Sequence, residues 1–338
     1  MKLNAIDLFS GCGGLSEGLR QAGFSVIAGI EIDKNAAEAY RMNHTNSILF
    51  EEDIRKVDIT KIKSLLGNEQ LHLLAGCPPC QGFSSIRRLN KKKAVQDKRN
   101  DLILEFLRYV IELKPLTIMM ENVPGLVNYH LYKKVVKELK TNYNIDYKVV
   151  DVAGYGVPQR RKRLVLVGSL LGPIQVAKEL NIIRTVRDVI YSLESINKTK
   201  DPIHKIYPIH TAKIQEMIKL IPINGGSRKD LPEKYWLDCH KKENIGFNDV
   251  YGRLKWDDVS STITGGCLNP SKGRFLHPEE NRCVTAREAA MLQTFPRSYK
   301  FPTNKSRAAL ALMIGNALPP EFSRIQADNI CKHLSEKL

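Results

Sequence analysis

The first 170 residues alternate short apolar runs with segments of helical spacing, and this alternation limits the possible folds more than any other feature of the sequence. Strand-like runs lie at residues 4–9, 24–30, 71–75, 117–120 and 163–167, and helical spacing at 15–22, 101–113 and 131–139. A chain that alternates in this way pairs its strands in parallel, with the helices as crossovers. The sequence therefore predicts an α/β fold built on a doubly wound, mostly parallel sheet.

The alternation stops at about residue 170, which indicates a second part of different construction. Short segments rich in Pro, Gly, Asn and Ser continue to about residue 280 and include polar loops at 240–244 and 269–273. Helical spacing returns at 285–292 and in a final helix over about 320–334. We therefore expect three parts: residues 1–170, a smaller loop-rich part at 171–280, and residues 281–338.

The chain is strongly basic, with 52 Lys and Arg residues against 36 Asp and Glu residues and a net charge of +16. Basic clusters occur at 87–88, 91–93, 98–99 and 160–163. A solvated basic surface is the simplest interpretation of any one cluster. An excess of this size nevertheless favours a polyanion such as nucleic acid over a small neutral substrate.

Two features indicate a cytoplasmic protein without membrane association. Asp7 interrupts the first apolar run, and no uninterrupted apolar segment approaches the roughly 18 residues that a membrane span needs. The seven cysteines are odd in number and irregularly spaced, which suits free thiols in a reducing compartment.

A glycine-rich turn, Ser10-Gly11-Cys12-Gly13-Gly14, follows the first strand and opens the first helix. Such a turn exposes backbone N–H groups and a helix N-terminus to a ligand, although it also serves as a plain connection. Glu31 ends the next strand about 20 residues later, where a carboxylate can accept from both ribose hydroxyls, and Asp53 lies in a later loop. This spacing favours an adenosine-containing cofactor. The alternative is that both acids are surface residues. The turn lacks the full G-x-G-x-x-G register, which argues against a pyrophosphate.

The stretch GCPPCQGFS contains Cys77 and Cys80, a spacing found in zinc sites and in redox pairs. A zinc site needs a second pair of ligands, and the sequence has no other CxxC or CxxH. A redox pair opens a helix directly, whereas a polar basic stretch follows Cys80. Pro78 and Pro79 stiffen the backbone before Cys80, which favours a thiol presented at the carboxyl end of a strand. We therefore expect no metal, a nucleophilic Cys80, and packing as the role of Cys77.

An acid and two cations are expected at the same edge of the sheet. Glu121 ends the apolar strand at 117–120, so it can share a pocket with Cys80. In an extended segment Arg161 and Arg163 point to one side, and both can face that pocket. The alternatives are a turn cap for Glu121 and a solvated edge for the arginines.

Six motifs in one order resemble those of the DNA (cytosine-5)-methyltransferase family, of the bacterial restriction-modification type. They are Phe9-Ser10-Gly11-Cys12-Gly13-Gly14, Pro79-Cys80-Gln81, Glu121-Asn122-Val123, Gln159-Arg160-Arg161-Lys162-Arg163, Arg287-Glu288 with Leu292-Gln293-Thr294-Phe295-Pro296, and Gly315-Asn316-Ala317-Leu318-Pro319-Pro320. The resemblance extends over nearly the whole chain. It implies a Rossmann-like catalytic and S-adenosylmethionine-binding domain at 1–170, a target-recognition domain at 171–280, and a hinge at 281–338 whose last helix returns to the catalytic domain.

The resemblance also implies roles for single residues. Phe9 would lie against the adenine, Glu31 would hold the ribose and Asp53 would accept from the adenine amino group. The full implied cofactor set is Phe9, Gly11, Gly13, Leu15, Glu31, Ile32, Asp53, Ile54, Pro79, Asn316 and Ala317. The implied catalytic set is Cys80 as nucleophile, Glu121 as acid, Arg161 and Arg163 as supporting cations, and Arg99 from a mobile loop that is longer here than the family pattern.

The implied reaction moves a methyl group from S-adenosylmethionine to carbon 5 of a flipped-out cytosine in double-stranded DNA, through a Cys80 adduct at carbon 6, and leaves S-adenosylhomocysteine. We expect a monomer without metal. Three alternatives stay open: a tRNA methyltransferase of the same family, a dinucleotide-dependent oxidoreductase, and a DNA-binding module without catalysis. Residues 251–256 and 261–266 resemble a recognition segment, in which Arg, Lys and Thr are candidates for base contacts and Trp256 is expected in the core.

Replacing residues 171–280 with the corresponding region of a relative that has another target should move the methylated sequence and preserve activity, because loops on a rigid scaffold change contacts without disturbing the sheet. Bisulfite sequencing of DNA methylated by the chimera checks this. Neutralising Lys91, Lys92 and Lys93 is the control: it should weaken binding to all DNA alike, since phosphate contacts carry no sequence information. An active chimera that keeps the original site would contradict the prediction.

Overall fold

The computed structural model describes residues 2–79, 101–236 and 249–338, and the chain forms two compact units. Unit 1 contains Met1–Tyr155, Lys162–Asn181 and Leu318–Leu338, and unit 2 contains Gly156–Arg161 and Ile182–Ala317. The three-part division expected from the sequence stays a prediction. None of the helices in the described ranges has the length and apolar character needed to cross a bilayer.

Within the described residues, unit 1 is built on a seven-stranded sheet with the order β3-β2-β1-β4-β5-β7-β6. The strands are β1 (Leu3–Leu8), β2 (Phe24–Ile30), β3 (Ile48–Phe50), β4 (Leu73–Gly76), β5 (Thr117–Asn122), β6 (Asn144–Asp151) and β7 (Lys162–Ser169). The first five pair in parallel, whereas β7 runs antiparallel to both β5 and β6. The predicted α/β fold with a mostly parallel sheet is therefore confirmed.

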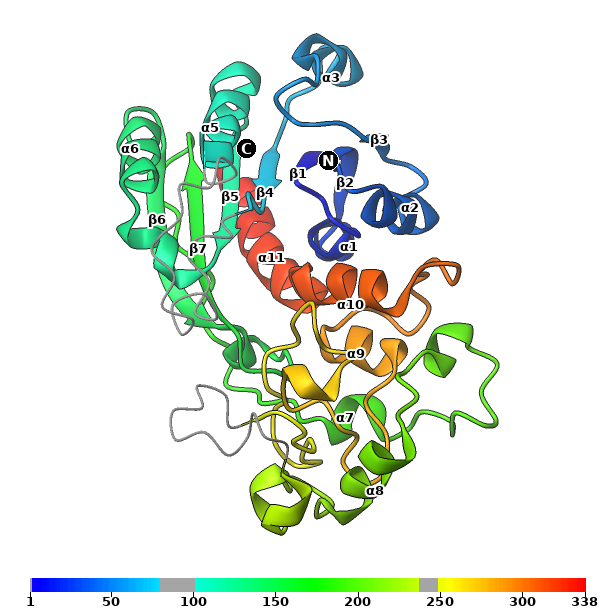
Figure 1. The fold of residues 1–338 in the computed structure, drawn as a ribbon. Coiled ribbons are helices and arrows are strands. Elements are labelled where there is room, and N and C mark those ends of the chain that lie inside the picture. Colours follow the sequence, from blue (N-terminus) through cyan, green and yellow to red (C-terminus); the bar gives the residue numbers. More distant parts are fainter. Residues whose placement is uncertain (1, 80–100, 237–248) are drawn as a thin grey trace. The chain divides into compact units, whose positions relative to one another are not determined.

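Helices cover both faces of this sheet. They are α1 (Gly14–Gln21), α2 (Lys34–Asn43), α3 (Ile59–Leu66), α5 (Leu102–Leu113), α6 (His130–Leu139) and α11 (Pro320–Lys337). Ile6 and Leu8 of β1 pack in one core with side chains of α3, α5 and α6, and α5 lies beside α6 (Figure 1). Asp7 alternates with these two residues and points to the other face, where Ser16 of α1 binds it. On that face α1 packs against α11.

Unit 2 has short helices joined by long loops: α7 (Arg187–Ile190), α8 (Ala212–Leu220), α9 (Ala286–Leu292) and α10 (Arg307–Asn316). A small apolar core gathers around Met217 and Ile218 of α8. Trp256 is 4% exposed, so its predicted position in the core is confirmed.

Arg253 was expected among the candidates for base contacts, and the structure contradicts this for that residue. Its side chain is 0% exposed. Its guanidinium donates to the carbonyls of Ile218, Ile221, His277 and Glu280 and to the side chain of Asn281, at 2.6–3.1 Å. An arginine whose guanidinium N–H groups all donate to groups inside the fold has no donor left for a base edge.

The close approach of α1 and α11 gives a stability prediction. A Cβ atom at Gly18 would lie 2.3 Å from the Ser323 Cβ and 2.4 Å from the Pro320 carbonyl oxygen. Gly18→Ala should therefore lower the free energy of unfolding by about 1–3 kcal/mol, as overpacking does. Ser335→Ala on the exposed face of α11 is the control and should change it by less than about 0.5 kcal/mol. Urea unfolding of both variants checks this, and equal stabilities would refute the close packing.

Candidate active site

The glycine turn after β1 has the backbone geometry of a ligand cradle. Gly11 and Gly13 have positive φ values of 55° and 93°, and Phe9 has φ 60°, which is rare for a bulky residue. A Cβ atom at Gly11 would meet no atom within 4 Å, so the turn borders open space. The predicted cofactor residue Leu15 is buried in the helix that follows. The turn therefore presents backbone and a helix N-terminus to this space.

Glu31 at the end of β2 is fixed against this turn. Its Oε2 accepts from the Gly11 N–H at 2.8 Å, and its Oε1 accepts from the Asp33 N–H at 2.7 Å. Burial raises the pKa of Glu31, and the two amide hydrogen bonds counteract that rise. The structure thus brings Glu31 to the glycine turn, with both carboxylate oxygens oriented by the backbone.

A buried acid beneath the turn was not singled out as a functional residue from the sequence. Asp7 is 0% exposed, accepts from the Ser16 hydroxyl at 2.6 Å, and has its pKa raised to about 7 by burial. The Ser16 hydroxyl lies 3.0 Å from the Tyr40 hydroxyl, which extends the network to α2. The sequence feature that could have identified Asp7 was an acid within an apolar strand. This hydrogen-bond network links β1, which leads into the glycine turn, to α1 and α2.

Asp53 lies in a turn before α3 and is bound by a residue that the sequence did not single out. Its carboxylate accepts from the backbone N–H of Arg55 at 3.0 Å and forms an ion pair with the Arg55 guanidinium, which lowers the Asp53 pKa to about 2. The side chain of the neighbouring Ile54 is in the core, whereas Ile32 is 63% exposed. A cavity of about 330 Å³, lined by Arg55 and the first residues of α5, borders this turn.

Glu121 at the end of β5 is ion-paired with Arg163 of β7. The Arg163 Nε and the Glu121 Oε1 are 2.6 Å apart, and both side chains are largely buried. The register explains the contact, because Glu121 lies opposite Val165 and Arg163 is two residues away on the same face. Arg163 therefore fixes the orientation of the carboxylate.

Cys77 and Asn122 also lie at this edge. Burial, together with the nearby Glu121 carboxylate to which the Cys77 thiol hydrogen-bonds, raises the Cys77 pKa well above its usual value. A thiol with a raised pKa stays protonated and is a poor nucleophile. The Asn122 side chain donates to the Pro78 carbonyl at 2.8 Å, which fixes the segment that leads to Pro79. Cys80 and Arg99 lie outside the described residues.

Arg161 belongs to unit 2, where its guanidinium donates to the carbonyls of Ile263 and Gly315 at 2.8 and 3.0 Å. Gln159 donates to Gln293 at 2.6 Å in the same unit. These contacts give Arg161 a structural role, and its predicted role beside the substrate stays a prediction. Asn316 is exposed at the end of α10 and Ala317 is buried, and their predicted role in the cofactor site also stays a prediction.

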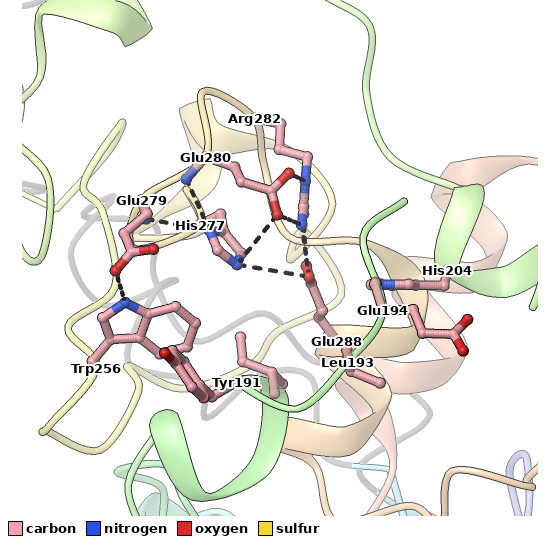
Figure 2. A pocket seen from close by; sticks show the side chains of 11 residues that line it. Tyr191, Leu193, Glu194, His204, Trp256, His277, Glu279, Glu280, Arg282 and Glu288 are labelled. Atoms are coloured by element: carbon pink, nitrogen blue, oxygen red, sulfur yellow. Dashed lines mark hydrogen bonds and ion pairs between the residues drawn. The ribbon is translucent and has the colours of Figure 1, made fainter. Parts of the chain in front are cut away.

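A second cavity, of about 140 Å³, lies within unit 2 (Figure 2). Arg282 donates to both carboxylate oxygens of Glu288 at 2.8 Å and also pairs with Glu280. Glu288 closes a capping box with Thr285 at the start of α9. This buried cluster is therefore a structural anchor for α9. Among the described residues, no group of three or more His, Cys, Asp or Glu side chains is arranged to hold a metal ion.

Sequence comparison relates nearly the whole chain to known proteins. A family profile described as C-5 cytosine-specific DNA methylase matches residues 3–332. The type II methylase M.HgiDII of Herpetosiphon aurantiacus is 37% identical, over 97% of this chain and 95% of the relative. The type II methyltransferase M1.HphI of Haemophilus parahaemolyticus is 30% identical, over 98% of this chain and 87% of the relative.

Structural comparison agrees. The crystal structure of a candidate DNA modification methyltransferase encoded within a prophage (E. coli) superposes with a TM-score of 0.76, at 26% identity and over 99% of this chain and 100% of that one. The structure of the S. pombe Dnmt2 methyltransferase has a TM-score of 0.69 at 19% identity, over 99% of both chains. The second likeness shows the shared fold alone.

The geometry at Glu31 gives a binding prediction. Glu31→Ala removes two oriented carboxylate acceptors and should weaken binding of S-adenosylmethionine by about 1.5–3 kcal/mol, the range for charge-assisted hydrogen bonds. Isothermal titration calorimetry measures the affinity. Glu138→Ala, which removes an exposed acid on α6, is the control and should bind normally. Unchanged affinity in Glu31→Ala would remove Glu31 from the cofactor site.

Proposed function

Because the chain belongs to the C-5 cytosine-specific DNA methylase family and is a DNA (cytosine-5)-methyltransferase, we propose that the carboxyl edge of the unit 1 sheet is its active site. One observation carries the proposal: the Glu121 carboxylate is held by Arg163 at the strand end next to the Cys77–Pro79 segment. An oriented acid beside the segment that leads to a nucleophile is the arrangement that addition to a cytosine ring needs.

The family depends on S-adenosylmethionine, and features of unit 1 fit that cofactor. The glycine turn borders open space, Glu31 offers two oriented acceptors for ribose hydroxyls, and Asp53 offers an acceptor for an adenine amino group. When bound, S-adenosylmethionine supplies a methyl group on a sulfonium. We propose the whole set expected from the sequence as its binding residues: Phe9, Gly11, Gly13, Leu15, Glu31, Ile32, Asp53, Ile54, Pro79, Asn316 and Ala317.

The proposed chemistry begins with Cys80. Its thiolate adds to carbon 6 of the cytosine and breaks the aromaticity, so that carbon 5 becomes nucleophilic. Glu121, in its carboxylic acid form, donates a hydrogen bond to ring nitrogen 3 and stabilises the charge that develops there, while Arg163 keeps its carboxyl group in place. After carbon 5 has taken the methyl group, its proton passes to a base and the Cys80 thiolate is eliminated. The products are 5-methylcytosine and S-adenosylhomocysteine. Arg161 and Arg99 are proposed as supporting cations.

The substrate that we propose is double-stranded DNA with a flipped-out target base, since a stacked cytosine has no face open to both thiol and methyl donor. The net charge of +16 supports binding to phosphates. The similarity to M.HgiDII supports a role in a type II restriction-modification system. We propose that the loops of unit 2 select the sequence and that the enzyme acts as a monomer.

Bisulfite sequencing of DNA from a host that expresses this chain tests the function. We expect 5-methylcytosine at every copy of one short sequence and at no other cytosine. Bisulfite sequencing of total RNA from the same cells is the parallel measurement. Methylation found only in tRNA would overturn the DNA substrate and would favour the RNA branch of the family.

The nucleophile assignment gives the most direct prediction. The wild-type protein should form a denaturation-resistant adduct with DNA that carries 5-fluorocytosine, because fluorine at carbon 5 blocks the elimination. Cys80→Ala should form no adduct and still bind S-adenosylmethionine. Cys331→Ala, a half-buried thiol on α11, is the control and should form the adduct normally. An adduct that survives in Cys80→Ala and is lost in Cys77→Ala would reverse the assignment.

A further inference from the structure

The turn that carries Asp53 and Ile54 is tied to α5 by two donors on one carbonyl. The Ile54 carbonyl accepts from the Arg108 Nη2 at 3.0 Å and from the Tyr109 hydroxyl at 3.2 Å. Both donors come from the same turn of α5, and neither was expected from the sequence. Ile54 itself is anchored by its buried side chain, so the turn is held on both sides of its backbone.

Arg108 contacts two further side chains of α5. Its Nε donates to Glu105 at 2.7 Å, one helical turn earlier, and its guanidinium lies 4.7 Å above the ring of Tyr109. Tyr109 is 0% exposed, and burial raises its pKa to about 12, so its hydroxyl remains a donor. A guanidinium held by an acid and a ring fixes the carbonyl that it binds more firmly than a free surface side chain does.

From this geometry we infer that Arg108 is a positioning residue for the cofactor. Through its hydrogen bond to the Ile54 carbonyl, Arg108 sets the position of the Asp53 carboxylate, which accepts a hydrogen bond from the adenine amino group. The inference rests on the proposed function for Asp53. Arg108 touches no reacting atom in this scheme. It acts on the affinity for the adenosine group and leaves the chemical step unchanged.

A double-mutant cycle on cofactor affinity tests the inference, with S-adenosylhomocysteine and the full-length protein in a calorimeter. Arg108→Met should weaken binding about tenfold, the loss expected for a charge-assisted hydrogen bond. In the Asp53→Ala background the same change should cost less than about twofold, because the group it positions is already absent. In steady-state assays KM for S-adenosylmethionine should rise in Arg108→Met while kcat stays within about twofold.

Two further variants make the test specific. Tyr109→Phe removes a single oxygen and should also weaken cofactor binding, by less than Arg108→Met does and only when Asp53 is present. This variant tests the inference if Arg108→Met folds poorly. Lys63→Met breaks the 2.9 Å ion pair between Lys63 of α3 and Glu112 of α5, and should bind normally.

The outcomes separate the inference from its premise. Additive losses in the double variant, or normal binding by Arg108→Met and Tyr109→Phe, would overturn the positioning role and leave the cofactor site intact. Normal binding by Asp53→Ala alone would overturn the proposed adenine partner, and the inference with it.

Discussion

The site depends on the parallel pairing of β2, β1, β4 and β5, because this pairing brings their carboxyl ends to one edge of the sheet. Phe9, Glu31 and Cys77 directly follow the ends of their strands, and Glu121 is the second-last residue of β5. They are far apart in the chain, and no local motif unites them. Main-chain hydrogen bonds between strands therefore determine which side chains can act together, and side-chain contacts such as Glu121 with Arg163 then fix their orientation.

The sequence predicted this edge well because two simple periodicities encode it. Apolar runs separated by helical spacing predict parallel strands, and an acid directly after such a run marks the edge, as Glu31 and Glu121 do. The antiparallel pairing of β7 was harder to anticipate. Residues 152–161 join β6 to β7 and contain the 3-10 helix η4 (Val152–Tyr155) but no crossover α-helix, and the direction of a strand follows from its connection rather than from its own residues.

The sequence could not predict which groups the charged side chains would bind. Arg55 binds Asp53 from two residues away, and Arg108 binds the Ile54 carbonyl from α5, yet both look like ordinary surface arginines in the sequence. Arg253 shows the opposite error, since an arginine in a loop-rich region suggests a surface contact and this one is fully buried. Local composition does not report burial in a region without regular periodicity, because burial there depends on how distant loops fold over one another.

Four of the five hydrogen bonds of Arg253 end on backbone carbonyls, and this has a consequence for how such an enzyme diversifies. A carbonyl is supplied by every amino acid, so a guanidinium that grips the main chain is indifferent to the identities of the residues it holds. The loops around Arg253 are thus free to exchange outward-facing side chains while their paths stay anchored. Four contacts of this buried cation depend only on the path of the main chain, and its contact with the Asn281 side chain is the one that depends on residue identity.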